Sequence, residues 1–132
     1  MSPVQSRSLT NALWVAQILL GLFFLMAGIV HGFQPVEQVA KSAPWAADVP
    51  VALLRFIALC ELAGAAGIVL PALTGVMRDV TTLAALGLMT IMLLAAIFHV
   101  SRGEPRMLPV NLSGALVAAF VAWGRTRLEA RV

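Results

Sequence analysis

Four long apolar stretches constrain this chain more than any other feature of its sequence. A helix rises about 1.5 Å per residue, so about 20 apolar residues are needed to cross a bilayer core of about 30 Å. The stretches of this kind are residues 13–32, 51–73, 80–100 and 109–123, of which only the last is short. We therefore predict an all-α membrane protein in which four transmembrane helices form a single domain over residues 1–132.

Composition supports lipid as the surrounding medium. Charged residues make up 11% of the chain, whereas soluble domains carry about a quarter. A secretory signal peptide would have an apolar core of about 7–15 residues that ends at small cleavage-site residues. The first stretch is longer and runs into His31, Gly32 and Phe33, so we interpret it as a retained span.

The connections between the spans predict how the helices are arranged. Residues 74–79 and 101–108 are short links, which make consecutive helices antiparallel neighbours in an up-and-down bundle. Asp79 or Thr81 is expected to cap the third span. The longest link, residues 34–49, mixes apolar and charged residues around Trp45. This mixture suits a short interfacial helix or lid, and an ordinary loop anchored by Trp45 is the alternative.

The distribution of basic residues predicts the orientation in the membrane. With four spans both termini share one side, and that side carries more cations by a small margin, namely Arg7, Arg78, Arg125, Arg127 and Arg131 against Lys41, Arg55, Arg102 and Arg106. We expect both termini in the cytoplasm and the protein in a bacterial cytoplasmic membrane. The cations are scattered rather than gathered on one face, so we expect no nucleic-acid partner.

Few polar side chains lie within the spans, and each requires a partner or a purpose in lipid. They are Gln17, His31, Arg55, Glu61, His99 and Asn111. The alternating helix directions place four of them, His31, Arg55, His99 and Asn111, in the same half of the membrane. Glu61 should lie about 15 Å from the start of its helix, at the floor of a site that the others surround.

Helical periodicity predicts that most of these side chains face the bundle axis. Gln17, His31, Glu61, His99 and Asn111 each share a helix face with Gly or Ala residues, and small residues mark the faces through which membrane helices approach one another. Arg55 lies about 120° around the helix from Glu61, so it either contacts the ligand or extends to the interface or the lipid head groups.

Glu61, His31 and His99 are the candidate catalytic residues. A carboxyl near the membrane centre costs about 2.5–3.5 kcal/mol on insertion, which favours a protonated or paired state suited to general acid chemistry. Imidazole titrates near neutral pH and can shuttle protons or bind a ligand. The alternative is structural: Glu61 joins neighbouring helices, and each histidine bonds the carbonyls at its helix end.

Asn111, Arg55 and Gln17 are the candidate substrate-binding residues, and contacts between helices are their alternative role. We predict no metal site, because neither histidine belongs to a dense ligand motif. Haem held by His31 and His99 is retained as an alternative. Cys60 stands alone and cannot form an intrachain disulfide, and no nucleotide-binding motif is present.

Three segments resemble the DoxX-like membrane proteins. They are AGIVHG (27–32), ELAGAAGIVLP (61–71) and AAIFHVSRGEP (95–105). The resemblance implies four transmembrane helices, and the name-giving relatives are membrane subunits linked to thiosulfate oxidation with a quinone as acceptor. It implies functional roles for His31, Glu61 and His99, with Arg102 and Glu104 after the last. The thiosulfate role is not carried over, because no cysteine pair is present for sulfur chemistry.

These features predict a polar pocket within the membrane that binds a lipophilic small molecule. A quinone is the leading candidate, with a redox partner protein supplying electrons, and the chain could also form a homo-oligomer. One alternative is an acid–base enzyme that needs no cofactor, such as an isomerase or hydrolase of an apolar epoxide-like substrate. The other alternative is a structural or assembly factor, in which the polar residues only join helices.

Overall fold

The computed structural model describes residues 2–130, and Arg131, one of the cations counted above, lies outside this range. The elements are α1 (Pro3–Phe33), α2 (Val36–Ser42), the 3-10 helix η1 (Pro44–Ala47), α3 (Val51–Thr74), α4 (Asp79–Ser101), the 3-10 helix η2 (Pro105–Met107) and α5 (Leu108–Glu129). Four helical segments, α1, α3, α4 and α5 together with η2, are long and apolar enough to cross a membrane. The predicted all-α class and four-span bundle are confirmed.

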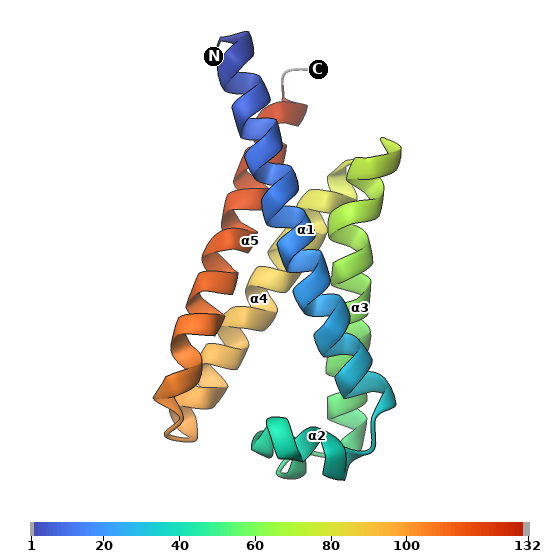
Figure 1. The fold of residues 1–132 in the computed structure, drawn as a ribbon, viewed down its shortest axis with the longest axis vertical. Coiled ribbons are helices and arrows are strands. Elements are labelled where there is room, and N and C mark those ends of the chain that lie inside the picture. The colour runs from blue at the N-terminus through green and yellow to red at the C-terminus, as the bar shows by residue number, and fades with distance from the viewer. Residues whose placement is uncertain (1, 131–132) are drawn as a thin grey trace.

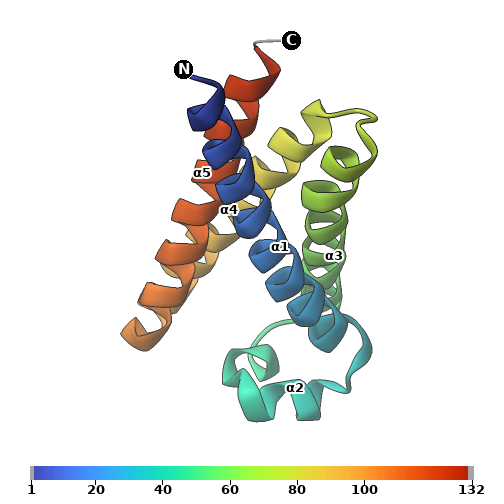
Figure 2. The same cartoon turned by 45° about the horizontal axis from the view of Figure 1, so that its top comes forward.

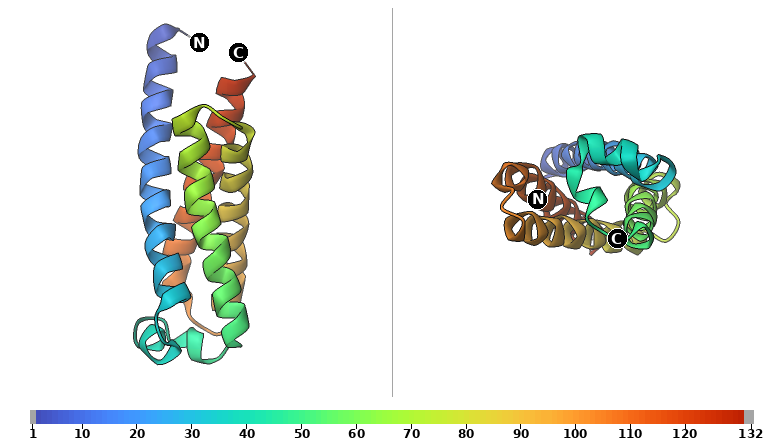
Figure 3. Two further views of the ribbon diagram at one scale, coloured as in Figure 1. Left: turned by 90° about the vertical axis from the view of Figure 1, so that its right-hand side faces the viewer. Right: turned by 90° about the horizontal axis from the view of Figure 1, so that it is seen from below.

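The four long helices form a closed ring of neighbours. α3 packs against α1 and α4, and α5 packs against the same two helices. Figure 1 and the left view of Figure 3 show both termini at one end of the bundle, as an up-and-down order requires. α2 lies across the opposite end (Figures 1 and 2), and the view from below in Figure 3 looks onto it.

Two of the helices are clearly longer than the predicted spans, since α1 starts earlier and α5 ends at Glu129, six residues after the predicted end. α1 begins at Pro3, ten residues before the predicted span, because Ser2 and Gln5 form a reciprocal capping box with hydrogen bonds of 2.8 and 3.3 Å. The predicted cap at Asp79 or Thr81 is wrong. α4 already starts at Asp79, so both side chains lie inside its first turn, and its N-cap residue Arg78 makes no side-chain capping bond.

Small residues bring the helices together, as the periodicity predicts. The buried faces contain Gly21 and Gly28 on α1, Ala58 and Ala65 on α3, Ala96 on α4, and Ala115, Ala118 and Ala122 on α5. At Gly64 the approach is closest, since a Cβ atom there would lie 2.3 Å from Leu88 Cδ2. Large apolar side chains such as Leu22, Leu83 and Leu116 remain exposed on the outside of the bundle, where lipid is their natural contact.

Candidate functional site

His31 and Glu61 form a polar pair between α1 and α3. Their Nδ1 and Oε2 atoms are 2.8 Å apart, and Glu61 is only 5% exposed. Helical side chains lean toward the N-terminus of their own helix. The two helices are antiparallel, so His31 near the end of α1 leans into the bundle and the deeper Glu61 leans back toward it. Each side chain therefore provides the polar partner that the other requires in an apolar medium.

Arg55 caps the end of α1. Its terminal nitrogens donate to the backbone carbonyl oxygens of His31 and Gln34, the latter at 2.9 Å. The last carbonyls of a helix have no partner inside the helix, and a cation is favoured beside them. Arg55 was expected to contact a ligand or to extend to the interface or head groups, and the end of α1 lies within its reach. Arg55 instead holds the backbone that carries His31.

His99 begins a chain of hydrogen bonds that leads out of the membrane. Its Nδ1 lies 2.6 Å from Glu104 Oε2, and the other oxygen of Glu104 accepts from Arg102 Nε at 3.0 Å. Arg102 also donates to Asp48 Oδ2 at 2.7 Å. The chain joins the end of α4 to the residue after η1, and the side chain of Asp48 is 58% exposed. It connects a buried histidine to the aqueous surface.

The electrostatics of this chain indicate which nitrogen of His99 holds a proton. The hydrogen bond from His99 lowers the pKa of Glu104, and Arg102 adds to this effect, while burial opposes it. The hydrogen bond to Asp48 raises the pKa of Arg102, as does the bond to Glu104. Glu104 is therefore an ionised acceptor, and His99 Nδ1 is the donor. In neutral His99 the other nitrogen, Nε2, carries the free lone pair.

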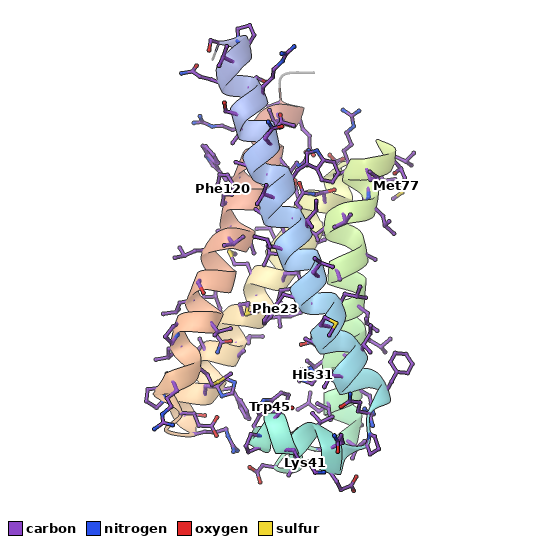
Figure 4. All side chains as sticks on the ribbon, viewed as in Figure 1. Phe23, His31, Lys41, Trp45, Met77 and Phe120 are labelled. Atoms are coloured by element: carbon purple, nitrogen blue, oxygen red, sulfur yellow. The ribbon has the colours of Figure 1, made fainter. Side chains whose placement is uncertain are left out.

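Trp45 on η1 lies beside both histidines. The centroid of its ring system is 5.4 Å from that of His31 and 6.5 Å from that of His99, with Phe98 at 6.1 Å. Figure 4 shows Trp45 and His31 together at the α2 end of the molecule. The link 34–49 is therefore partly helical and brings one large aromatic residue over the polar residues, which agrees with the predicted short helix or lid.

A cavity of about 360 Å³ lies between α3 and α4 beneath Trp45. Its polar wall includes Glu61 and His99, and the rest is almost wholly apolar, comprising Trp45, Val49, Leu53, Phe56, Ile57, Cys60, Ile91, Leu94, Ala95 and Phe98. Phe56 and Leu94 also belong to the exposed outer surface of the bundle. The cavity therefore opens sideways onto the outer surface of the bundle.

The structure gathers the predicted site residues only in part. Glu61 and His99 line the cavity, and His31 is joined to it through Glu61. Gln17 lies about 21 Å along α1 from His31. There it accepts from Arg125 and donates to the carbonyl of Ile68.

Asn111 is buried at the start of α5, outside the residues that line the cavity. Its Nδ2 has no hydrogen-bond partner among residues 2–130. Within the same described range, no three His, Cys, Asp or Glu side chains are grouped so as to hold a metal ion.

Two residues of the site were missed by reasoning from the residues alone. Trp45 was predicted within an interfacial helix, lid or anchored loop but not as a wall of the cavity, and Asp48 was not predicted as part of the site. Arg102 and Glu104 entered only through the family resemblance. Both residues follow His99 within five positions, just after the end of α4, and this closeness is the one local signal that could have indicated them.

Comparison with known proteins identifies the family. The model of the DoxX-like family matches residues 15–121, which include both histidine–carboxylate pairs. No curated protein and no solved structure matches the chain. The matched region covers most of the sequence, with all of α3 and α4 and the greater part of α1 and α5. The chain is therefore an integral membrane protein that belongs to the DoxX-like family.

Proposed function

We propose that the cavity between α3 and α4 binds a lipophilic small molecule whose polar head exchanges protons, and that this molecule is a quinone. The observation that carries the proposal is an apolar cavity, open onto the outer surface of the bundle, with Glu61 and His99 in its wall. Its volume of about 360 Å³ lies within the usual range of small-molecule sites, about 300–1,000 Å³. A ligand that enters from the bilayer meets polar groups only at the inner end.

The two polar residues suit the chemistry of a quinone head. A quinone takes up two electrons and two protons to become a quinol, and its carbonyl oxygens accept hydrogen bonds before reduction. Protonated Glu61 and the imidazolium form of His99 can each donate such a bond and then a proton. Electrons would come from a redox partner protein, since the sequence contains no cysteine cluster or haem-attachment motif.

The hydrogen-bond chain from His99 fixes the orientation of the imidazole ring in the cavity wall. Glu104 accepts from Nδ1 of His99 and holds it in one orientation, so that Nε2 is the nitrogen available for proton exchange. Arg102 and the exposed Asp48 continue the chain to the aqueous side. Guanidinium keeps its proton, so Arg102 orients Glu104 and does not pass protons along the chain.

A second candidate function, acid–base catalysis without electron transfer, is favoured by the two carboxylate–imidazole pairs. Glu61 is paired with His31, and His99 is paired with Glu104. With an apolar epoxide in the cavity, Glu61 would protonate the ring oxygen while His99 Nε2 takes a proton from the attacking water. This reaction consumes water and requires no partner protein.

Ligand capture tests the proposal directly. We would purify the wild type, Glu61→Leu and the control Glu37→Leu in detergent, and identify bound lipids by mass spectrometry with a visible spectrum. Each protein would then be titrated with a short-chain ubiquinone while quenching of tryptophan fluorescence is followed, because Trp45 lines the cavity. Glu37 is an exposed carboxylate on α2, so its replacement makes the same chemical change outside the cavity.

We expect the wild type and Glu37→Leu to bind the quinone equally and Glu61→Leu to bind it about tenfold more weakly, the effect of one lost hydrogen bond. Equal binding by all three folded proteins, or no quenching in any of them, contradicts the quinone proposal. Hydrolysis of an apolar epoxide that depends on Glu61, without quinone binding, would instead support the second candidate. A Soret band in the wild type would replace quinone with haem.

A further inference from the structure

A second cavity lies at the end of the bundle that carries both termini. Its volume is about 440 Å³, and it is lined by Ser6, Trp14, Ala72, Arg78, Thr81, Arg125, Leu128 and Glu129. These residues come from the start of α1, the end of α3, the start of α4 and the end of α5. Met77, next to Arg78 in the chain, lies in Figure 4 at the opposite end from His31 and Trp45. The two cavities are therefore separate.

The second cavity carries an excess of positive charge. Two guanidinium groups, those of Arg78 and Arg125, face one carboxylate, that of Glu129. Arg125 is held in place, because Nε and one terminal nitrogen donate to Gln17 Oε1 and its guanidinium carbon lies 5.0 Å from the Trp14 ring centroid. Arg78 is exposed directly before α4. One arginine is thus anchored and the other is free to close on a ligand.

Thr81 adds an unused polar group to the same wall. It is 1% exposed, and its Oγ1 has no hydrogen-bond partner among residues 2–130. It lies in the first turn of α4, where the helix dipole is positive. A buried hydroxyl without a partner is unfavourable unless something outside the protein chain satisfies it. The charge and the unpaired hydroxyl both favour a ligand with anionic oxygen atoms.

We propose that this cavity binds a phosphate group, supplied by an anionic phospholipid of the leaflet on the side of the termini. Guanidinium groups match phosphate oxygens in geometry and charge. The cavity lies where the helices end, which is the depth of the lipid head groups. Leu73 and Met77, next in sequence to the lining residues Ala72 and Arg78, are exposed and offer an apolar surface for acyl chains. This site is independent of the quinone proposal.

Lipid-dependent stabilisation of the purified protein tests this site. We would record thermal unfolding of the full chain in detergent with increasing phosphatidylglycerol, phosphatidylcholine or inorganic phosphate. The variants are Arg78→Gln and the control Arg7→Gln. Arg7 is exposed at the same end and does not line the cavity, so the control removes the same charge from the same region.

We expect phosphatidylglycerol to stabilise the wild type and Arg7→Gln at the same concentrations, and Arg78→Gln to require about fivefold more, as the loss of one arginine near a head group implies. The site would instead bind a soluble phosphate compound if inorganic phosphate stabilised the wild type and Arg7→Gln but not Arg78→Gln, and if neither lipid had an effect. The proposal is overturned if Arg78→Gln and Arg7→Gln weaken the stabilisation by phosphatidylglycerol to the same extent. It is also overturned if none of the three additives stabilises the wild type.

Discussion

Gly64 sets the distance between α3 and α4 one helical turn beyond Glu61, so its enlargement is a direct test of the packing. An added Cβ atom would lie 2.3 Å from Leu88 Cδ2 and 2.8 Å from Leu88 Cγ. Carbon atoms in favourable contact are about 3.5–4.0 Å apart. The side chain of Leu88 is fully buried, so it has little room in which to rotate away. The Gly64→Ala substitution must therefore move the two helices apart or strain Leu88.

The size of this effect can be separated from helix propensity by a matched control. Replacing Gly by Ala inside a helix is favourable by about 1 kcal/mol, while overpacking costs about 1–3 kcal/mol. Gly87 on α4 is the control, because an added Cβ atom there meets nothing within 4 Å. The helix contribution is common to both substitutions, so Gly64→Ala should be less stable than Gly87→Ala by about 1–3 kcal/mol.

The assay is reversible unfolding in mixed detergent micelles, with helicity followed by circular dichroism as the denaturing detergent increases. We expect Gly87→Ala to be at least as stable as the wild type. Gly64→Ala should unfold at a lower fraction of denaturing detergent than Gly87→Ala. Equal unfolding curves for the two variants would refute the inferred close approach of α3 and α4. Because the cavity lies between these helices, Gly64→Ala should also weaken quinone binding.

Two further predictions concern charged residues at opposite ends of the bundle. The pKa of Glu104 is lowered from its ordinary value of 4.5 by the hydrogen bond from His99. The bond between ionised Glu104 and His99 therefore stabilises the fold at pH values above 4.5, and this stabilisation is lost as the pH falls through the lowered pKa of Glu104. Glu104→Gln should lose less stability than the wild type between pH 5 and pH 3 in thermal unfolding experiments. At the other end, Arg125→Met should lower the free energy of unfolding by about 1–3 kcal/mol, because buried Gln17 Oε1 loses its donors.

Each of these predictions has a control in the same chain. Glu37→Gln removes an exposed carboxylate on α2 and should leave the acid dependence unchanged. An equally steep acid loss in Glu104→Gln would mean that the His99 pair does not contribute. Arg127 is exposed at the same end as Arg125, with its guanidinium carbon 4.9 Å from the Trp123 ring centroid. If Arg127→Met destabilised the protein as much as Arg125→Met, the bond to Gln17 would not be the cause.

The buried faces of the helices could be predicted because they depend only on local spacing. Gln17, Glu61, His99 and Asn111 are buried as the periodicity of small residues indicates. Which of them share a site depends on where each lies along its own helix. Gln17 shares a helix face with His31 but lies about four turns away from it, so it serves the other end of the bundle.

The partners of the polar residues could not be predicted in the same way. Arg102 bonds Asp48 across 54 positions of sequence, and no spacing rule relates residues so distant in the chain. Arg55 was judged only by its angle from Glu61, yet its bonds are to the end of α1. A long flexible side chain reaches whatever acceptor the fold brings near, so the angle on its own helix does not decide its contact.

By itself the sequence determined that the chain crosses the membrane four times and which face of each helix is buried. Both properties follow from the order of apolar, small and polar residues within about 20 positions, since the bilayer imposes the length and the helix imposes the period. Only the tertiary structure decided that Trp45 covers a cavity between α3 and α4, and that Arg78 and Arg125 share another at the opposite end. Those sites arise where segments far apart in the chain meet, and such meetings are set by the packing of whole helices.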